Sequence, residues 1–300
     1  MRVFSLADAE DRLVWIFGSS RSGSTWLLRM LSSFPGVVPV DDPHLGHHLG
    51  VWRPISLAWA VADGPPELTT LDRVKRDKDD YFFCDRYREA WAPALRRLIV
   101  ERFDAAARAA RPGGAEPLVV VKEPGSHVAD LLVSLFPASR LVFLLRDGRD
   151  VVDSWLDAYR TGTWAQDEGA FPVGDGGREA LVRWQSAVWA FRTEVVQRTY
   201  AAHPPDRRVL VRYEDLVADP AAELGRICAR LPVAAARDDL AAVAAEHAYD
   251  AVPRTERGDG RAIRSASPGG WRENLSRAEQ DLMHEVLGPA LASVGYAGPG

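Results

Sequence analysis

Residues 18–25 form a glycine and hydroxyl pattern that suits the binding of phosphate or sulfate groups. They read Gly-Ser-Ser-Arg-Ser-Gly-Ser-Thr. In such a loop the backbone N–H groups and the start of the next helix converge on an oxyanion. ATPases and GTPases place a lysine before the final hydroxyl, whereas this chain has Ser24 there and Arg21 three positions earlier. The missing lysine argues against hydrolysis of ATP or GTP. We therefore expect a different phosphorylated ligand.

A second group of candidate anion-binding residues lies at 146–154, which read Arg-Asp-Gly-Arg-Asp-Val-Val-Asp-Ser. Arg146 follows an apolar segment, and Ser154 falls in the first turns of the next expected helix. A guanidinium fork with a hydroxyl suits a phosphate monoester. In a simpler interpretation, Arg146 to Asp150 form surface ion pairs and Asp150 caps the helix.

Short apolar segments alternate with helical patterns along the chain. Strands are expected at 13–17, 118–121, 141–145 and 209–211. Helices are expected at 24–33, 89–111, 128–135, 150–159, 179–200, 219–230, 237–247 and 277–291. This order predicts an α/β fold with a P-loop-like, doubly wound parallel sheet flanked by helices. We expect a single domain over residues 1–300, with loop insertions at 62–70, 161–177 and 251–270, and a ligand at the carboxyl ends of the strands.

The composition and the lengths of the apolar segments argue against several classes of protein. A net charge of −5 argues against a protein that coats nucleic acid. No apolar segment is long enough to span a membrane, and the few residues before the first expected strand leave no room for a signal peptide. Cys84 and Cys228 form no disulfide framework and fit packed thiols. We expect a cytoplasmic protein with a sizeable core, which the 47% of hydrophobic residues allows.

The two anion motifs, in this order, resemble those of the sulfotransferases that use 3′-phosphoadenosine 5′-phosphosulfate (PAPS). Residues 21–27 resemble their 5′-phosphosulfate loop. Residues 145–150 with Ser154 resemble their 3′-phosphate motif, including the eight positions from arginine to serine. Residues 211–216 and 270–275 resemble later segments of the family, so the similarity runs from about residue 12 to residue 280.

The resemblance implies a set of residues that bind PAPS as co-substrate. They are Arg21, Ser22, Gly23, Ser24, Thr25, Trp26, Arg146, Ser154, Tyr213, Arg264 and Ser265. Arg264 stands seven positions before Trp271, where the cytosolic branch has a basic residue that binds the 3′-phosphate. The family needs no metal. The sequence adds no metal site, because the cluster of His44, His47 and His48 lacks a fourth ligand at a recognisable spacing.

The general base differs between branches of the family. The cytosolic branch has a Lys-x-His element where this chain has Lys122-Glu123-Pro124, with His127 further on. That branch therefore assigns no base here, and Glu123 and His127 remain reserve candidates.

The tyrosylprotein branch matches residues 21–35 without gaps. It places its catalytic glutamate at Asp42, with Asp41 as a second acid, and its lysine that stabilises the bridging oxygen at Lys122. We therefore expect Asp42 to be the general base, with Arg21 and Lys122 stabilising developing charge. In a simpler interpretation, Asp41-Asp42-Pro43 is a turn that caps the next helix.

The resemblance predicts in-line transfer of a sulfuryl group to a hydroxyl of a small molecule such as a phenol, sugar or lipid-like metabolite, as in secondary metabolism. Residues 44–60, with Trp52 and Trp59, form either an acceptor pocket or a helix packed on the sheet. The alternatives are a P-loop kinase or NTPase, which would need the missing lysine, and a catalytically inactive nucleotide-binding protein. The sequence does not indicate an oligomeric state.

Overall fold

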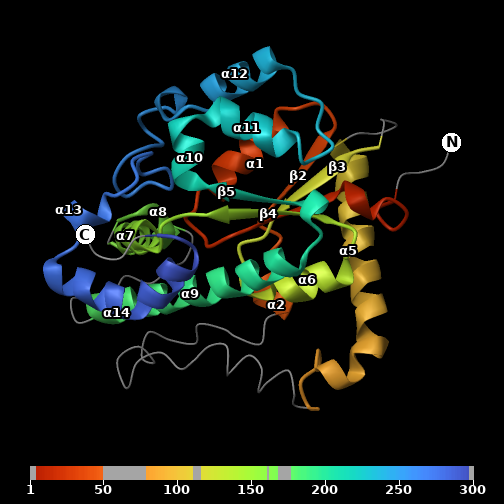
Figure 1. Ribbon diagram of the computed structural model, residues 1–300, viewed down its shortest axis with the longest axis horizontal. Coiled ribbons are helices and arrows are strands. Elements are labelled where there is room, and N and C mark those ends of the chain that lie inside the picture. The colour runs from red at the N-terminus through yellow and green to blue at the C-terminus, as the bar shows by residue number, and fades with distance from the viewer. Residues whose placement is uncertain (1–4, 50–78, 111–115, 161, 168–176, 297–300) are drawn as a thin grey trace.

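The structure is a computed structural model that describes residues 5–49, 79–110, 116–160, 162–167 and 177–296 (Figure 1). Its centre is a five-stranded sheet in the order β2-β3-β1-β4-β5, in which all neighbouring strands are parallel. The strands are β1 (Leu13–Phe17), β2 (Val37–Asp41), β3 (Leu118–Lys122), β4 (Arg140–Leu145) and β5 (Arg208–Arg212). The predicted α/β fold and the four predicted strands are confirmed.

The central strands form because their residues are apolar on both faces. Every residue of β1 and β3 is buried, as expected for parallel strands that helices cover on both sides. Ile16 lies beside Lys122 of β3 on one side and beside Val142 of β4 on the other.

The sequence pattern does not indicate β2, which lies at an edge of the sheet and pairs only with β3 within the described residues. This strand contains Pro39, which has no backbone N–H and is tolerated mainly at sheet edges. The same proline removes the strand signal from the sequence pattern.

Helices cover both faces of the sheet, as Figure 1 shows. One face packs against α1 (Ser24–Ser32), α10 (Tyr213–Ala218), α11 (Pro220–Cys228) and α12 (Arg237–Glu246). The other packs against α5 (Arg88–Ala110), α6 (Ala129–Leu135), α7 (Gly148–Ala158), α9 (Arg178–Ala202) and α14 (Arg277–Ser293). The short helices are α2 (Leu45–Leu49), α8 (Trp164–Asp167) and α13 (Trp271–Asn274).

The predicted helices are present with ends that differ by a few residues. The segment expected at 128–135 begins with a 3-10 turn, Ser126–Val128, before α6. Cys84 and Cys228 are buried free thiols, and burial raises the pKa of Cys228 to about 11. No helix within the described ranges is both long enough and apolar enough to cross a membrane. The insertion expected at 62–70 lies outside the described residues, and so do Trp52 and Trp59 of the segment 44–60.

The parallel arrangement brings the motif residues to one edge of the sheet. Gly18, Lys122, Arg146 and Tyr213 stand at or directly after the carboxyl ends of four strands, and Asp41 ends the fifth. This edge is where ligands bind in open α/β sheets.

Candidate active site

The loop from Gly18 to Gly23 connects β1 to α1, and it contains polar groups that lack hydrogen-bond partners in the described structure. Gly23 has φ of 85°, and a side chain at this position would begin 2.7 Å from the ring of Tyr213, so only glycine fits. No side chain caps the N-terminus of α1. The hydroxyl of Ser22 is buried and has no hydrogen-bond partner in the described structure. The loop and the start of Ser24–Ser32 therefore offer donors suited to an oxyanion.

Lys122 joins the first turn of α1 to the two carboxylates at the end of β2. It is 5% exposed, and its Nζ donates to Thr25 Oγ1 at 2.7 Å. The same Nζ lies 2.6 Å from Asp41 Oδ1 and 2.8 Å from Asp42 Oδ2. The other oxygen of Asp42, Oδ1, is buried with no hydrogen-bond partner among the described residues. The structure thus places Thr25, Lys122 and Asp42 in one cluster.

The first turn of α2 is held by Glu123 and not by the aspartates. The carboxylate of Glu123 accepts the N–H groups of Leu45 at 2.8 Å, Gly46 at 3.2 Å and Gly125 at 2.7 Å. Burial raises the pKa of Glu123, while these three N–H groups act in the opposite direction. The alternative in which Asp42 caps the next helix is therefore wrong. Glu123 fills that position.

His127, the other reserve base, lies in the 3-10 turn after β3. It is 2% exposed, and its ring centre is 6.4 Å from that of Phe191 on α9. Within the described ranges no group of three or more His, Cys, Asp or Glu residues could hold a metal ion.

Arg146 connects the second motif to the first. Its Nη1 donates to the backbone oxygen of Arg21 at 2.9 Å, and its guanidinium lies 4.3 Å from the centre of the Tyr213 ring. Its Nε is buried with no hydrogen-bond partner in the described structure. Trp26 contacts the edge of Tyr213 and donates to the carbonyl of His247 at 2.8 Å. Arg146 and Tyr213 thus form a stacked pair beside the loop.

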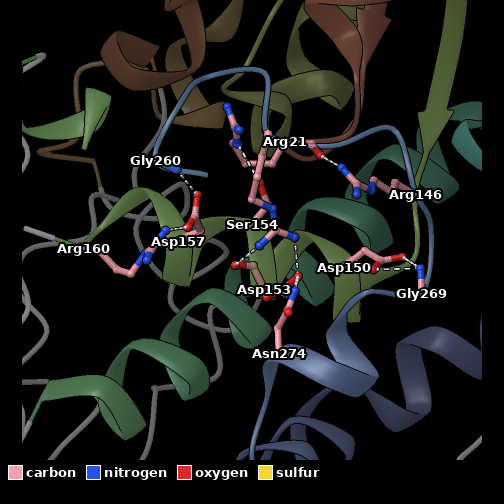
Figure 2. A network of polar contacts seen from close by, with 11 residues as sticks. Arg21, Arg146, Asp150, Asp153, Ser154, Asp157, Arg160, Gly260, Gly269 and Asn274 are labelled. Atoms are coloured by element: carbon pink, nitrogen blue, oxygen red, sulfur yellow. Dashed lines mark hydrogen bonds and ion pairs between the residues drawn. The ribbon is translucent and has the colours of Figure 1, made fainter. Parts of the chain in front are cut away.

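Arg21 reaches from the first motif to Ser154 of the second, as Figure 2 shows. Its Nε donates to Ser154 Oγ at 3.0 Å, and its Nη2 donates to the carbonyl of Ala262 at 2.8 Å. Its guanidinium stacks 5.0 Å from the centre of the Trp164 ring. Arg21 also has φ of 71°, which is uncommon for a residue other than glycine. These contacts bring the two predicted anion sites together.

Three acidic residues on α7 hold the segment 260–274, which we call the covering loop (Figure 2). Asp150 accepts the N–H of Gly269 at 2.8 and 3.0 Å. Asp153 pairs with Arg264 and accepts from Asn274 at 3.0 Å. Asp157 accepts the N–H of Gly260 at 3.0 Å.

The simpler interpretation of residues 146–150 is also wrong. Asp147 caps α7 by accepting the N–H of Arg149, and its carboxylate pairs with the same arginine, whose side chain is buried. Asp150 is turned instead to the covering loop, and burial raises its pKa. Arg264 pairs with Asp153, which directly precedes Ser154 in the sequence. Ser265, by contrast, is exposed.

Sequence reasoning missed the roles of Asp153, Asp157 and Asn274. The signal was present in part, because positions 150, 153 and 157 share one face of a helix. Their partners in the covering loop have no regular pattern that would reveal them.

The sequence profile of the Sulfotransferase family matches residues 14–237 of this chain. The chain belongs to the sulfotransferase family. It is an enzyme that transfers sulfuryl groups. No curated protein matches it in sequence.

Solved structures of two sulfotransferases and of a retinol dehydratase share its fold. Sulfotransferase STF9 from Mycobacterium avium has 16% identity and a TM-score of 0.55, over 98% of this chain and 80% of that chain. Mouse sulfotransferase SULT7A1, in complex with PAP, has 11% identity and a TM-score of 0.53, over 95% and 85% of the two chains. Retinol dehydratase, in complex with retinol and PAP, has 14% identity and a TM-score of 0.50, over 96% and 84%.

Proposed function

We propose that this sulfotransferase moves the sulfuryl group of PAPS to a hydroxyl of a small-molecule acceptor. The observation that carries the proposal is a pair of buried groups, Ser22 Oγ and Arg146 Nε, neither of which has a hydrogen-bond partner in the described structure. They lie on the two anion motifs that Arg21 joins. Buried polar groups normally find partners, so a ligand with two separate anionic groups fits this arrangement.

The donor has such groups in its 5′-phosphosulfate and its 3′-phosphate. The loop and the start of α1 suit the first, and Arg146, Ser154 and Arg264 suit the second. The mouse sulfotransferase and retinol dehydratase structures both contain PAP, the nucleotide that remains after transfer. That retinol dehydratase also holds retinol supports a small-molecule acceptor for this chain.

In the proposed reaction, the acceptor oxygen forms a bond to sulfur while the bond from sulfur to the phosphate oxygen breaks. Negative charge develops on the sulfonate oxygens and on the departing phosphate, and PAP leaves with that electron pair. The catalytic contribution is mainly electrostatic stabilisation and positioning. Lys122 beside Thr25 is suited to the charge on the departing oxygen, since its ammonium is buried and held at 2.7 Å from that hydroxyl.

The proton of the acceptor hydroxyl must go to a base, and we assign this role to Asp42. Its Oδ1 has no hydrogen-bond partner in the described structure, whereas both oxygens of Glu123 already accept backbone N–H groups. Asp42 is also directly beside Lys122. Glu123 and His127 stay as reserve candidates.

Calorimetric titration with PAP and with ATP–Mg²⁺, together with transfer of radiolabelled sulfate from PAPS, tests the function. We expect PAP to bind equally well with and without Mg²⁺, and labelled sulfate to appear on acceptors in a metabolite extract. Binding of ATP only with Mg²⁺, and none of PAP, would show that the enzyme uses another donor. The labelled product would identify the acceptor.

A further inference from the structure

Arg192 has a buried guanidinium beside the loop from Gly18 to Gly23. Most hydrogen-bond donors of this guanidinium are unused within the described structure. It lies on α9, and the residue is 7% exposed. Its Nη1 donates to Ser20 Oγ at 3.2 Å, and its Nε is buried without a partner. Ser20 is the single acceptor that this side chain has among the described residues. Since a guanidinium carries five N–H donors, most of its donors have no acceptor.

The charge of Arg192 also lacks an ion pair within the described residues. Glu123 is the carboxylate that acts on it electrostatically, but the oxygens of Glu123 are engaged by Leu45, Gly46 and Gly125. Burial lowers the pKa of Arg192 to about 10, so the side chain stays positive at neutral pH. A buried, unpaired charge is unfavourable. A bound anion would relieve this cost.

Two other cations near this loop, Arg21 and Lys122, already have partners in the protein. The guanidinium of Arg21 donates to Ser154 Oγ and to the carbonyl of Ala262. The ammonium of Lys122 is offset by the two carboxylates of Asp41 and Asp42. Arg192 therefore differs from Lys122, because no carboxylate of the described residues forms an ion pair with it.

Arg192 approaches the loop from the side opposite to α1. The helix α9 packs on one face of the sheet, and α1 packs on the other. An oxyanion in the loop can therefore meet the N-terminus of α1 from one side and the guanidinium from the other. Two-sided contact of this kind holds an anion more firmly than the helix terminus alone.

We propose that Arg192 forms an oxyanion subsite at the sulfuryl end of the donor site, an inference that rests on the proposed function. The shared chemistry is a tetrahedral or planar oxyanion, with two sources: the sulfonate of the donor, or a carboxylate carried by an acidic acceptor. In either case Arg192 binds a group that PAP itself does not have.

Three variants separate this role from a structural one. Arg192→Gln keeps a donor for Ser20 and removes the charge, and Arg192→Lys keeps the charge. Arg198→Gln is the matched control, because Arg198 lies on the same helix and pairs with Glu194 at 3.1 Å on the surface. Calorimetry measures the Kd of PAP, of PAPS, and of benzoate added to PAP-saturated enzyme, and a thermal melt of each variant checks folding.

We expect Arg192→Gln to weaken binding of the anion by about 10- to 100-fold, as for loss of a charged hydrogen bond. The affinity for PAP should be nearly unchanged. A selective loss of PAPS indicates the donor sulfonate, and a selective loss of benzoate indicates an acidic acceptor. Arg192→Lys should recover part of either loss, and Arg198→Gln should show none. Equal losses for PAP, PAPS and benzoate, or no loss for any, would overturn the subsite. A wild-type enzyme that does not bind PAP would instead overturn the proposed function itself.

Discussion

The two ends of the proposed donor site are built in different ways. At the sulfuryl end, Lys122 ends a buried strand and its ammonium contacts Thr25, Asp41 and Asp42 at 2.6–2.8 Å. At the 3′-phosphate end, Arg264 belongs to the covering loop, which has no strand or long helix of its own and is held by acids of α7. The first end takes its geometry from the sheet. The second combines Arg146, which directly follows β4, with an arginine that side-chain contacts hold in place.

This difference predicts a division of labour. Groups fixed by a buried sheet are positioned well enough to act on the reacting atoms, where small displacements are costly. Groups held by a loop can bind a phosphate and still release it. We therefore expect substitutions at the sulfuryl end to lower kcat, and substitutions at the 3′ end to weaken nucleotide binding.

The largest effect should follow replacement of Lys122 by methionine. Loss of one hydrogen-bond donor that stabilises charge in the transition state typically lowers kcat by about 10²–10³-fold. The substitution also leaves Asp41 and Asp42 without their cation. Steady-state transfer of labelled sulfate would measure it, with the Kd of PAP expected to change little. A loss confined to PAP affinity would mean that Lys122 belongs functionally with the 3′ end.

Asp42→Asn should lower kcat by about 10²-fold or more, because it keeps the shape of the side chain and removes the base. Donor affinity should be nearly unchanged. Asp41→Asn is the matched control, since Asp41 also contacts Lys122 but is not the proposed base. Near-normal turnover in Asp42→Asn, with a collapse in Glu123→Gln or His127→Ala, would move the base to the segment after β3.

At the other end, Arg146→Ala should weaken PAP by about 10- to 100-fold, the range for a charged hydrogen bond. Adenosine 5′-phosphate, which lacks the 3′-phosphate, should lose much less. Competitive titration of both nucleotides against the variant gives the two ratios. Equal losses would show that Arg146 does not read the 3′-phosphate.

Asp153→Asn should have the smallest effect, a weakening of PAP by about 3- to 10-fold with kcat preserved. The substitution removes the charge that orients Arg264, and this indirect effect should be smaller than loss of a direct hydrogen bond to a charged group, which contributes about 1.5–3 kcal/mol. Arg264→Met should give a similar loss, and the double variant should lose little more than either one. Additive losses would separate Arg264 from Asp153.

The central sheet could be read from the sequence because four of its strands are continuous apolar segments. The edge strand β2 could not, since Pro39 interrupts the pattern and only pairing with β3 makes Val37–Asp41 a strand. The caps were also unpredictable in detail. Whether Asp42 or Glu123 holds the first turn of α2 depends on how two strand ends meet in space.

The site divides in the same way. Arg21, Arg146 and Ser154 were predicted because their motifs follow expected strand ends, and Asp42 and Lys122 were predicted from the resemblance to the tyrosylprotein branch. Arg192 gave no local signal, since one more arginine in a long helix is unremarkable in a chain with 37 basic residues. Its meaning comes from burial against Ser20, which only the folded chain shows. The acceptor pocket expected around Trp52 and Trp59 stays a prediction.

Within the described residues β2 is an edge strand, and this position bears on how the sheet could associate with other molecules. An open sheet edge can pair with a strand of another molecule, and proteins prevent this with prolines and charges on edge strands. Pro39 removes one donor from β2, and the exposed Asp41 puts a negative charge at its end. The strand that carries an acid to Lys122 therefore also protects the sheet from growing into an aggregate.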